Sequence, residues 1–318
     1  YFLATFFNSA IGRRQTNRFV SGATRDRILL TNQRKLLIPT LASDFQLRIE
    51  VLCKAAYKSI GTSKNLYHQA EHLLLYELGL QDWQPQHQLT FVRHSSEASQ
   101  AHRVDAEHFQ PKYNNLLDHI RSYTNGFCSI TDIAYNSTET VEPRNYPEQP
   151  IEYIELANIN QVTGVIESTN VILGKEAPSR ARMFLRSGDV IASSVKGSVD
   201  KVARVPDAYH GAIGSTGFFV LRPCTVESGY LLALVKSVIV REQMECEASG
   251  TILAAVPGKS LHNVIVPDIP GPKRNEIAIL VEQSHAVRRE AQALLEKAKH
   301  AVEIAIEQGE EQAMAFLG

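Results

Sequence analysis

The sequence predicts an α+β protein: a mixed α/β domain with a twisted, partly antiparallel sheet, joined to two long helices that form an antiparallel coiled-coil spacer. Three observations predict this fold: a pattern that occurs twice, a long amphipathic stretch after each copy, and a series of β-rich segments between the copies. The 318 residues, 44% of them hydrophobic, are enough for one sizeable core with further elements.

The first fifty residues recur in pattern near the end of the chain. At a constant offset of 228, Pro39 meets Pro267 and Ile49 meets Ile277. Both copies predict a short helix, a Ser-Gly turn, a strand ending in Pro and then a long helix. The residues that are identical in the first part of the two copies are Ser9 and Ser237, Ile11 and Ile239, Arg13 and Arg241, Gln15 and Gln243, Ser21 and Ser249, and Gly22 and Gly250.

A long amphipathic stretch follows each copy. From about Asp44 to Leu80, and again from Ile277 to Ile306, apolar residues recur at steps of three and four, which is typical of a helix. The apolar seam is narrow and edged with charge, which favours two helices packed as an antiparallel coiled coil. The alternative is two ordinary amphipathic helices in one core.

We expect four segments: 1–40 as the C-terminal remnant of a first globular domain, 41–83 as a first spacer helix, 84–270 as one complete domain, and 271–318 as a second spacer helix. In the complete domain, the polar run 93–103 predicts a loop, and Pro111 to Arg121 predicts a short helix because Pro suits a first helical turn. The glycine-rich run 211–217 predicts a flexible turn. The predicted β-rich segments are 151–159, 164–168, 183–195, 202–205 and 217–223.

Several phrases resemble one family. The runs RVDAEHFQPKYNNLLDHI (103–120), YIELANINQVTGVI (153–166), SRARMFLRSGDVIASSV (179–195) and STGFFVLRP (215–223) resemble, in order, the target recognition domain of type I restriction-modification specificity (S, HsdS) subunits. LYHQAEHLLLYELGLQDW (66–83) resembles the helical region that joins the family's two recognition domains. The family has two complete recognition domains, whereas residues 1–40 resemble only the tail of the first.

The resemblance implies a non-catalytic, sequence-specific DNA-binding protein. Such a subunit reads one half of a bipartite site in double-stranded DNA with each recognition domain. The methyltransferase (M) subunits would dock on the helices, the restriction (R) subunit would join them, and the methyl donor would bind the partner, so we assign this chain no cofactor. Self-association through the spacer helices is a further expectation.

The charge pattern supports DNA contact only locally. The formal net charge is -1, but 180–204 has six basic residues against two acidic ones, and 1–40 has seven against one. Basic clusters bind phosphates through counterion release, and small hydroxyl residues in loops approach phosphates closely. The alternative is a solvated basic face. The predicted DNA-binding residues are Arg180, Arg182, Ser194, Lys196, Ser198, Lys201, Arg204, Ser215 and Thr216.

Other classes of function have weaker support. HQAEH (His68 to His72) matches the H-x-x-E-H spacing of zinc metallopeptidases that use two histidines and a glutamate, here His68, Glu71 and His72. The second helix has Glu296, Lys299 and His300 at the matching positions, and no third ligand stands out. No carboxylate-x-Lys nuclease element, NPPY-like methyltransferase motif or phosphate-binding GxxxxGK[ST] motif occurs. Two further alternatives are the recognition module of a fused restriction-methylation enzyme and a helical dimeriser with a non-DNA ligand domain.

The cysteines bear on the compartment. Cys53, Cys128, Cys224 and Cys246 lie far apart without a CxxC pair, which argues against a structural zinc site or a secreted disulfide framework. No apolar run is long enough to span a bilayer, and no signal-peptide pattern opens the sequence. We therefore expect a cytoplasmic location. Because the chain starts at Tyr1, we also expect a fragment of a longer protein.

Overall fold

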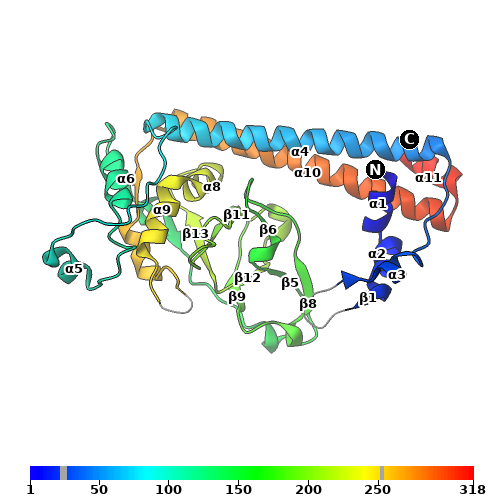
Figure 1. The fold of residues 1–318 in the computed structure, drawn as a ribbon, viewed down its shortest axis with the longest axis horizontal. Helices are drawn as coiled ribbons and strands as arrows, with labels where there is room; N and C mark the ends of the chain where they lie inside the picture. Colours follow the sequence, from blue (N-terminus) through cyan, green and yellow to red (C-terminus); the bar gives the residue numbers. More distant parts are fainter. Residues whose placement is uncertain (22–26, 251–253) are drawn as a thin grey trace. The chain divides into compact units, whose positions relative to one another are not determined.

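The computed structural model describes residues 1–21, 27–250 and 254–318, which form two compact units. The first unit is Tyr1–Asn65 with Ser284–Gly318, and the second unit is Leu66–Gln283. Gly22 of the predicted turn, and Arg25 and Asp26 of the charge count, lie outside the described residues. The mixture of helix and sheet confirms the predicted α+β class (Figure 1).

Two short helices at the N-terminus pack against the long helices of the first unit. They are α1 (Phe2–Asn8) and α2 (Ala10–Phe19), separated by Ser9, whose hydroxyl accepts a hydrogen bond from the amide of Gly12 and so caps α2. A small antiparallel pair, β1 (Val20–Ser21) and β2 (Arg27–Ile28), and helix α3 (Leu30–Gln33) follow. Phe6 is fully buried in the core of this unit.

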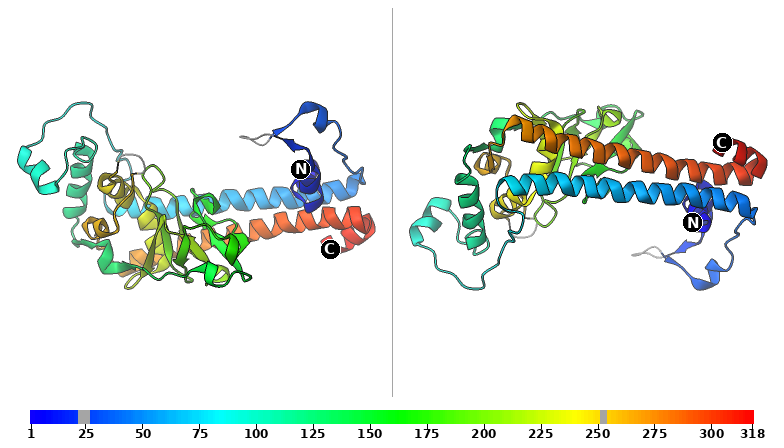
Figure 2. Two further views of the ribbon diagram at one scale, coloured as in Figure 1. Left: turned by 90° about the horizontal axis from the view of Figure 1, so that it is seen from below. Right: turned by 90° about the horizontal axis from the view of Figure 1, so that it is seen from above.

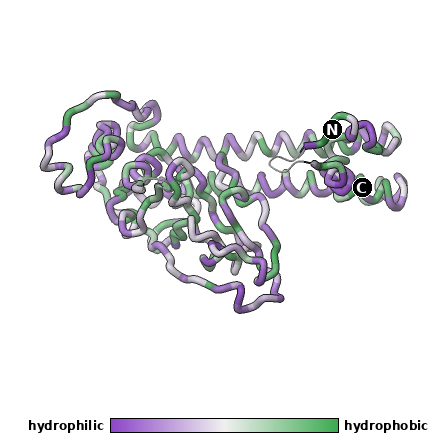
Figure 3. The backbone as a smooth tube through the Cα atoms, turned by 60° about the horizontal axis from the view of Figure 1, so that its bottom comes forward, coloured by the Kyte–Doolittle hydropathy of each residue, from purple (hydrophilic) through white to green (hydrophobic). Residues whose placement is uncertain are grey.

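The two predicted long helices are present. They are α4 (Ser43–Glu77) and α10 (Gly271–Glu307), and each runs through both units. Polar and apolar residues alternate along both (Figure 3), as expected where one stripe of a helix is buried. Within 271–318 the helix is not continuous, because Gly309 has a φ of +99° and α11 (Glu310–Leu317) follows it.

The long helices pair in opposite directions in each unit (Figure 2). In the first unit Ile49, early in α4, shares a core with Val302, late in α10. The hydroxyls of Ser63 and Ser284 lie 3.1 Å apart in the same unit. In the second unit Lys273, at the start of α10, forms an ion pair of 3.2 Å with Glu77, at the end of α4. The predicted antiparallel pairing is therefore confirmed within each unit.

The strands of the second unit form two four-stranded sheets. One is antiparallel in the order β11-β10-β13-β4, and the other is mixed in the order β8-β5-β12-β9 with β5 and β12 parallel. Two further pairs, β14-β3 and β6-β7, are antiparallel. The strands are β3 (Phe127–Ser129), β4 (Ala134–Asn136), β5 (Pro150–Ile154), β6 (Ile159–Asn160), β7 (Val165–Ile166), β8 (Asn170–Leu173), β9 (Ala181–Phe184), β10 (Val190–Ser193), β11 (Val202–Arg204), β12 (Ile213–Ser215), β13 (Phe218–Pro223) and β14 (Ile265–Pro267).

The helices of the second unit cover these sheets and reach the long helices. Helix α8 (Ser228–Lys236) is apolar nearly all round and contacts β10 and β11. The predicted helix at Pro111 is confirmed as α6. The shorter helical elements are α5 (Ser95–Ala101), α6 (Pro111–Arg121), α7 (Ile130–Ile133), α8 (Ser228–Lys236), α9 (Val238–Glu247), η1 (Pro143–Asn145), η2 (Leu156–Asn158), η3 (Gly174–Glu176), η4 (Asp207–Tyr209) and η5 (Gly258–Asn263).

Two local predictions were wrong. The polar run 93–103 contains helix α5, begun by a capping box in which Glu97 accepts from the amide of His94 at 2.8 Å. The run 211–217 is not a flexible turn, because it contains β12, an inner strand between β5 and β9. Gly214 allows close packing there, since an added Cβ would lie 3.1 Å from the Leu185 side chain.

The duplicated sequence folds twice into the same arrangement, with one exception. In the first copy the side chain of Gln15 donates to the carbonyl of Leu37 at 2.9 Å and accepts from its amide at 2.7 Å. In the second copy Gln243 makes the same two bonds to Ile265, both at 2.8 Å. The exception is the predicted strand ending at Pro39, which is absent from the first copy. Its equivalent β14 pairs with β3 in the second unit, and among the described residues no strand pairs with Leu37 to Pro39.

Candidate nucleic-acid interface

Three loops that carry predicted DNA-binding residues lie together in the second unit. The amide of Thr216 donates to the carbonyl of Arg180 at 2.8 Å. The amide and the hydroxyl of Ser194 both donate to the carbonyl of Gly217, at 2.9 and 3.0 Å. Lys196 and Ser198 follow in the same loop as Ser194. We call this set the loop edge: Arg180, Ser194, Lys196, Ser198, Ser215 and Thr216.

The loop edge is held by backbone geometry. Gly197 has a φ of +75°, and its amide donates to the Glu245 carboxylate at 3.1 Å. The amide of Lys196 donates to the carbonyl of Ala254 at 2.9 Å, and the buried hydroxyl of Ser215 accepts from the amide of Gly217 at 3.2 Å. These bonds fix the backbone, so that the exposed side chains of Arg180, Lys196 and Thr216 project from an ordered edge.

Lys201 and Arg204 point elsewhere. The ammonium group of Lys201 donates to the carbonyl of Ile159 at 3.2 Å. The guanidinium of Arg204 donates to the Glu282 carboxylate of α10 at 2.8 Å and to the Ser228 hydroxyl at 3.3 Å. Both side chains thus hold elements of the second unit together.

The positive balance of 180–204 is largely compensated in space. Arg182 forms an ion pair with Glu142, and Arg186 forms one with Glu139 at 2.9 Å. These acidic partners, like Glu282, lie outside the segment, so a charge count along the segment cannot find them. Among the described residues, Arg180 and Lys196 have no ion-pair partner.

A buried ion pair beside this region was missed by the sequence analysis. Arg222 of β13 makes two hydrogen bonds to Asp189, at 2.7 and 2.9 Å, and Asp189 is only 1% exposed. The hydrogen bond from Arg186 lowers the pKa of Glu139, which also faces Arg222 at 3.4 Å. These charges join β13, the segment that follows β4 and the turn before β10, so their function is structural.

A polar cavity of about 890 Å³ adjoins the loop edge at Lys196. Its basic lining residues are His102, Arg103, His108, Lys196 and Lys259, and its acidic ones are Asp105, Glu107 and Glu247. Arg103 is tied to Asp105 by bonds of 2.6 and 2.7 Å. Lys196 and Lys259 are therefore the exposed cations here that have no carboxylate bonded to them among the described residues.

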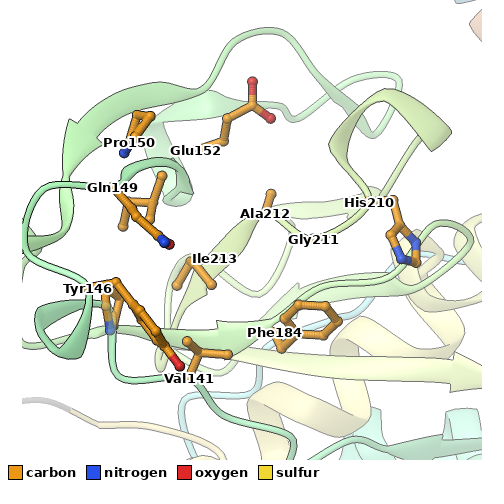
Figure 4. A pocket seen from close by; sticks show the side chains of 12 residues that line it. Val141, Tyr146, Gln149, Pro150, Glu152, Phe184, His210, Gly211, Ala212 and Ile213 are labelled. Atoms are coloured by element: carbon orange, nitrogen blue, oxygen red, sulfur yellow. The ribbon is translucent and has the colours of Figure 1, made fainter.

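A second cavity of about 390 Å³ lies on the mixed sheet (Figure 4). Phe184 and His210 meet edge to face across its rim, with ring centroids 6.4 Å apart, and Tyr146 stands at the opposite side. Glu152 and Gln149 supply the polar groups.

The histidines of the zinc alternative lie exposed on α4. His68 faces Glu71 at 3.7 Å, and His72 stacks on Tyr76. Among residues 1–21, 27–250 and 254–318, no group of three His, Cys, Asp or Glu side chains is placed to hold a metal ion. This arrangement gives the zinc alternative no support.

The thiol of Cys246 lies beside a histidine but lacks the properties of a catalytic nucleophile. The Cys246 thiol lies 3.5 Å from Nδ1 of His108, which also lies 2.9 Å from the Cys246 carbonyl. Burial raises the pKa of Cys246 to about 12, so the thiol is protonated at neutral pH.

No helix among the described residues is long and apolar enough to cross a membrane.

Comparisons with known proteins found similar solved structures. No family model matches the chain, and no curated protein matches it. It is 27% identical to a chain of the structure described as "Structural basis underlying complex assembly and conformational transition of the type I R-M system", with a TM-score of 0.44. It is 30% identical to the HsdS subunit from Thermoanaerobacter tengcongensis, with a TM-score of 0.45.

Each of these matches covers 57% of this chain and 46% of the solved chain, so this chain spans less than half of the length of either relative. The chain is thus similar to part of a solved HsdS subunit and to part of a chain of a type I restriction-modification structure.

Proposed function

We propose that this chain is a non-catalytic DNA-specificity subunit of a type I restriction-modification complex. Residues 84–270 read one half of a bipartite DNA site, and the long helices carry the methyltransferase subunits. The proposal depends mainly on one observation. An apolar core that packs short helices against the paired long helices occurs twice, once in each unit.

The two attachment cores are equivalent residue by residue. In the first unit Phe6, Ile49, Cys53, Ala298 and Val302 share one core. Shifting each by 228 residues along the chain gives Leu234, Ile277, Val281, Ala70 and Leu74, which share one core in the second unit. A pair of antiparallel helices with equivalent cores has two places to hold a globular domain, as a reader of two separated half-sites requires.

The length of the helices suits this function. A continuous helix of 35 residues, the length of α4, extends about 52 Å at ~1.5 Å per residue. Half-sites one turn of DNA apart are separated by ~34 Å. The spacer is therefore long enough to leave base pairs between the half-sites unread.

The first copy supports an equivalent globular domain at residues 1–40. The side chain of Ile38 is 49% exposed, whereas that of the equivalent Val266 is fully buried where β14 pairs with β3, and the neighbouring Leu37 is 77% exposed. We propose that residues 1–40 are the attachment end of a first recognition domain, and that a strand like β3 of that domain pairs at Leu37 to Pro39.

The loop edge is the proposed DNA-reading surface. Its exposed members Arg180, Lys196 and Thr216 are free to reach phosphates or bases, and Ser198 is half-buried beside them. Arg182, Lys201 and Arg204 would contact DNA only by exchanging the intramolecular partners described above, so we expect their contribution to be smaller.

We propose one methyltransferase docking surface in each unit, on the exposed side of α4 in the first unit and of α10 in the second. Val51 and Ile279 are equivalent by the offset of 228 and are 58% and 55% exposed. Apolar side chains on the outer faces of charged helices suit the centre of a protein interface. We expect V51D and I279D each to weaken co-purification of a methyltransferase subunit, and the double variant to abolish it, with the fold unchanged by circular dichroism.

DNA binding tests the reading function. The purified chain should bind duplex DNA at low salt, and the R180A/K196A variant should bind more weakly with a shallower salt dependence. R182A is the matched control, because Glu142 already neutralises that guanidinium. Absence of duplex binding by the unaltered chain at low salt would contradict the proposal, and equal affinity of all variants would contradict the loop edge.

A further inference from the structure

We propose that the first unit carries a phosphate-binding surface of its own on α2 and the segment that follows it. The N-terminal basic surface consists of Arg13, Arg14, Arg18, Arg27, Arg34 and Lys35. All six side chains are exposed, and none has an ion-pair partner among the described residues. The proposal rests on the proposed DNA-binding function, and it gives a second region of the chain a role in it.

The fold brings these six residues to one region. Arg13, Arg14 and Arg18 lie on two successive turns of α2, since positions four apart in a helix are neighbours. The pairing of Ser21 with Arg27 returns the chain to the end of α2. The two bonds between Gln15 and Leu37 hold the segment with Arg34 and Lys35 against the same helix.

The second copy shows whether the fold itself requires these basic residues. It has the same helix pair, the same serine between the helices and the same glutamine bonds, so these features make up the fold. Residues 1–40 have seven basic and one acidic residue, whereas the equivalent 229–268 has three basic and four acidic. The positions equivalent to the six are Arg241, Glu242, Cys246, Ala255, His262 and Asn263.

The basic residues are therefore not required by the fold. Arg241, the one basic residue that recurs, faces the Glu242 carboxylate at 3.7 Å in the second copy. A surface that keeps six exposed, uncompensated cations at a cost in mutual repulsion indicates a polyanionic partner. By contrast, Arg182, Arg186 and Arg204 in the second unit are each neutralised by a carboxylate.

The side-chain chemistry favours DNA phosphates. Five of the six cations are arginines, whose planar guanidinium forms paired hydrogen bonds to phosphate oxygens. Exposed Asn17 and Ser21 and half-exposed Thr16 lie among them, and such residues commonly add uncharged phosphate contacts. The partner is thus the sugar-phosphate backbone of duplex DNA, contacted independently of base sequence.

The test measures the salt dependence of binding to a random-sequence duplex, using the full chain. Each phosphate contact adds about 0.9 to the slope of log affinity against log salt. R13Q/R14Q/R18Q should reduce the magnitude of the slope by about 2.7. When the salt is raised from 50 to 200 mM, the factor by which affinity falls should therefore be about 40 times smaller for the variant than for the parent. Glutamine keeps the helix propensity and the aliphatic stem, and circular dichroism verifies the fold.

Two control variants separate this surface from general charge loss. R241Q changes the equivalent of Arg13 in the second copy, and K58Q/K64Q removes two exposed cations of α4 in the first unit; both should leave the slope nearly unchanged. An unchanged slope in R13Q/R14Q/R18Q, with a reduced slope in R180A/K196A, would overturn this inference and leave the proposed function intact. Absence of duplex binding by the parent would overturn both.

Binding to anionic lipid vesicles is the remaining outcome. Vesicles of phosphatidylserine and phosphatidylcholine should not retain the chain at 150 mM salt. If they retain it, and R13Q/R14Q/R18Q abolishes retention without changing duplex binding, the surface is a membrane contact and the inference is overturned.

Discussion

Residues 1–40 and 229–268 are two versions of one structural unit, and they differ in what surrounds them. In both, two short helices separated by a serine pack on the long helices, and a glutamine holds the next segment. The second copy is covered by β3 and by the rest of the globular domain, whereas the first copy leaves Leu37 and Ile38 exposed. The comparison separates the residues that make the fold from those whose importance depends on a neighbour.

The largest expected difference is at the equivalent positions Ile38 and Val266. Val266 is fully buried, so V266D places a carboxylate in an apolar core and should lower the free energy of unfolding by about 3 kcal/mol or more. Ile38 is half-exposed, so I38D should change it by about 0.5 kcal/mol or less. Urea denaturation measures both, and equal effects would show that the first copy is covered in the same way as the second.

Loss of the glutamine bonds should also lower the free energy of unfolding more in the second copy than in the first, although the difference should be smaller. Gln243 is 5% exposed, so Q243L leaves the amide and carbonyl of Ile265 without the side-chain partner that they have in the native structure. We expect a loss of about 2–4 kcal/mol. The bonds of Gln15 are exposed to water, so Q15L should cost less than about 1 kcal/mol. A cost for Q15L as large as that for Q243L would contradict the difference in burial.

The pH dependence of stability tests whether Lys236 of the second copy is buried while its equivalent in the first copy is exposed. Burial lowers the pKa of Lys236 to about 8, and its ammonium group donates to the carbonyl of Gln161; the equivalent residue in the first copy is the exposed Asn8. Because the pKa is lower in the folded state than the ordinary value of about 10.5, the unfolded state binds more protons between pH 8 and 10.5. The difference in stability between the parent and K236M should therefore shift in favour of the parent across this range, by roughly 2–3 kcal/mol.

Denaturation of both proteins at intervals from pH 7 to pH 10.5 measures this difference. N8M serves as the control at the equivalent position, and its difference from the parent should not change with pH. A constant difference for K236M would show that Lys236 is not buried as the structure describes.

The smallest effect is expected in the long helices. The hydroxyl of Ser284 donates to the carbonyl of Ser63 at 2.7 Å and also contacts the Ser63 hydroxyl. The positions equivalent to this pair are Ala291 and Ala56, both fully buried. Because alanine is buried at both equivalent positions, we expect S63A/S284A to change the free energy of unfolding by less than about 1 kcal/mol. A large loss would show that the helix pair depends on the hydroxyls and is not equivalent in its two halves.

The sequence predicted what is repeated or periodic and failed where partners are distant. The long helices follow from the spacing of apolar residues such as Ile49 and Ile277, and the duplication follows from residues such as Gln15 and Gln243. The strand at Leu37 was predicted from its likeness to 265–267, but a strand requires a partner, and β3 lies in a distant part of the chain. The β12 strand was missed because its glycines indicate turns in isolation, although Gly214 serves close packing against Leu185.

The predicted DNA-binding residues show the same limit. Arg180 and Lys196 are exposed cations, but Arg182 and Arg204 are neutralised by Glu142 and Glu282, which are distant in sequence. Charge along a segment therefore indicates a basic surface only when no carboxylate from another element approaches it.

The most direct measurement for the central claim is the methylome of cells with and without the gene, read by sequencing that detects methylated adenine. If this chain supplies DNA specificity, one bipartite motif, two short half-sites with a fixed unread spacer, is methylated only when the gene is present. An identical set of methylated motifs in both strains, with the methyltransferase partner expressed, would contradict the account.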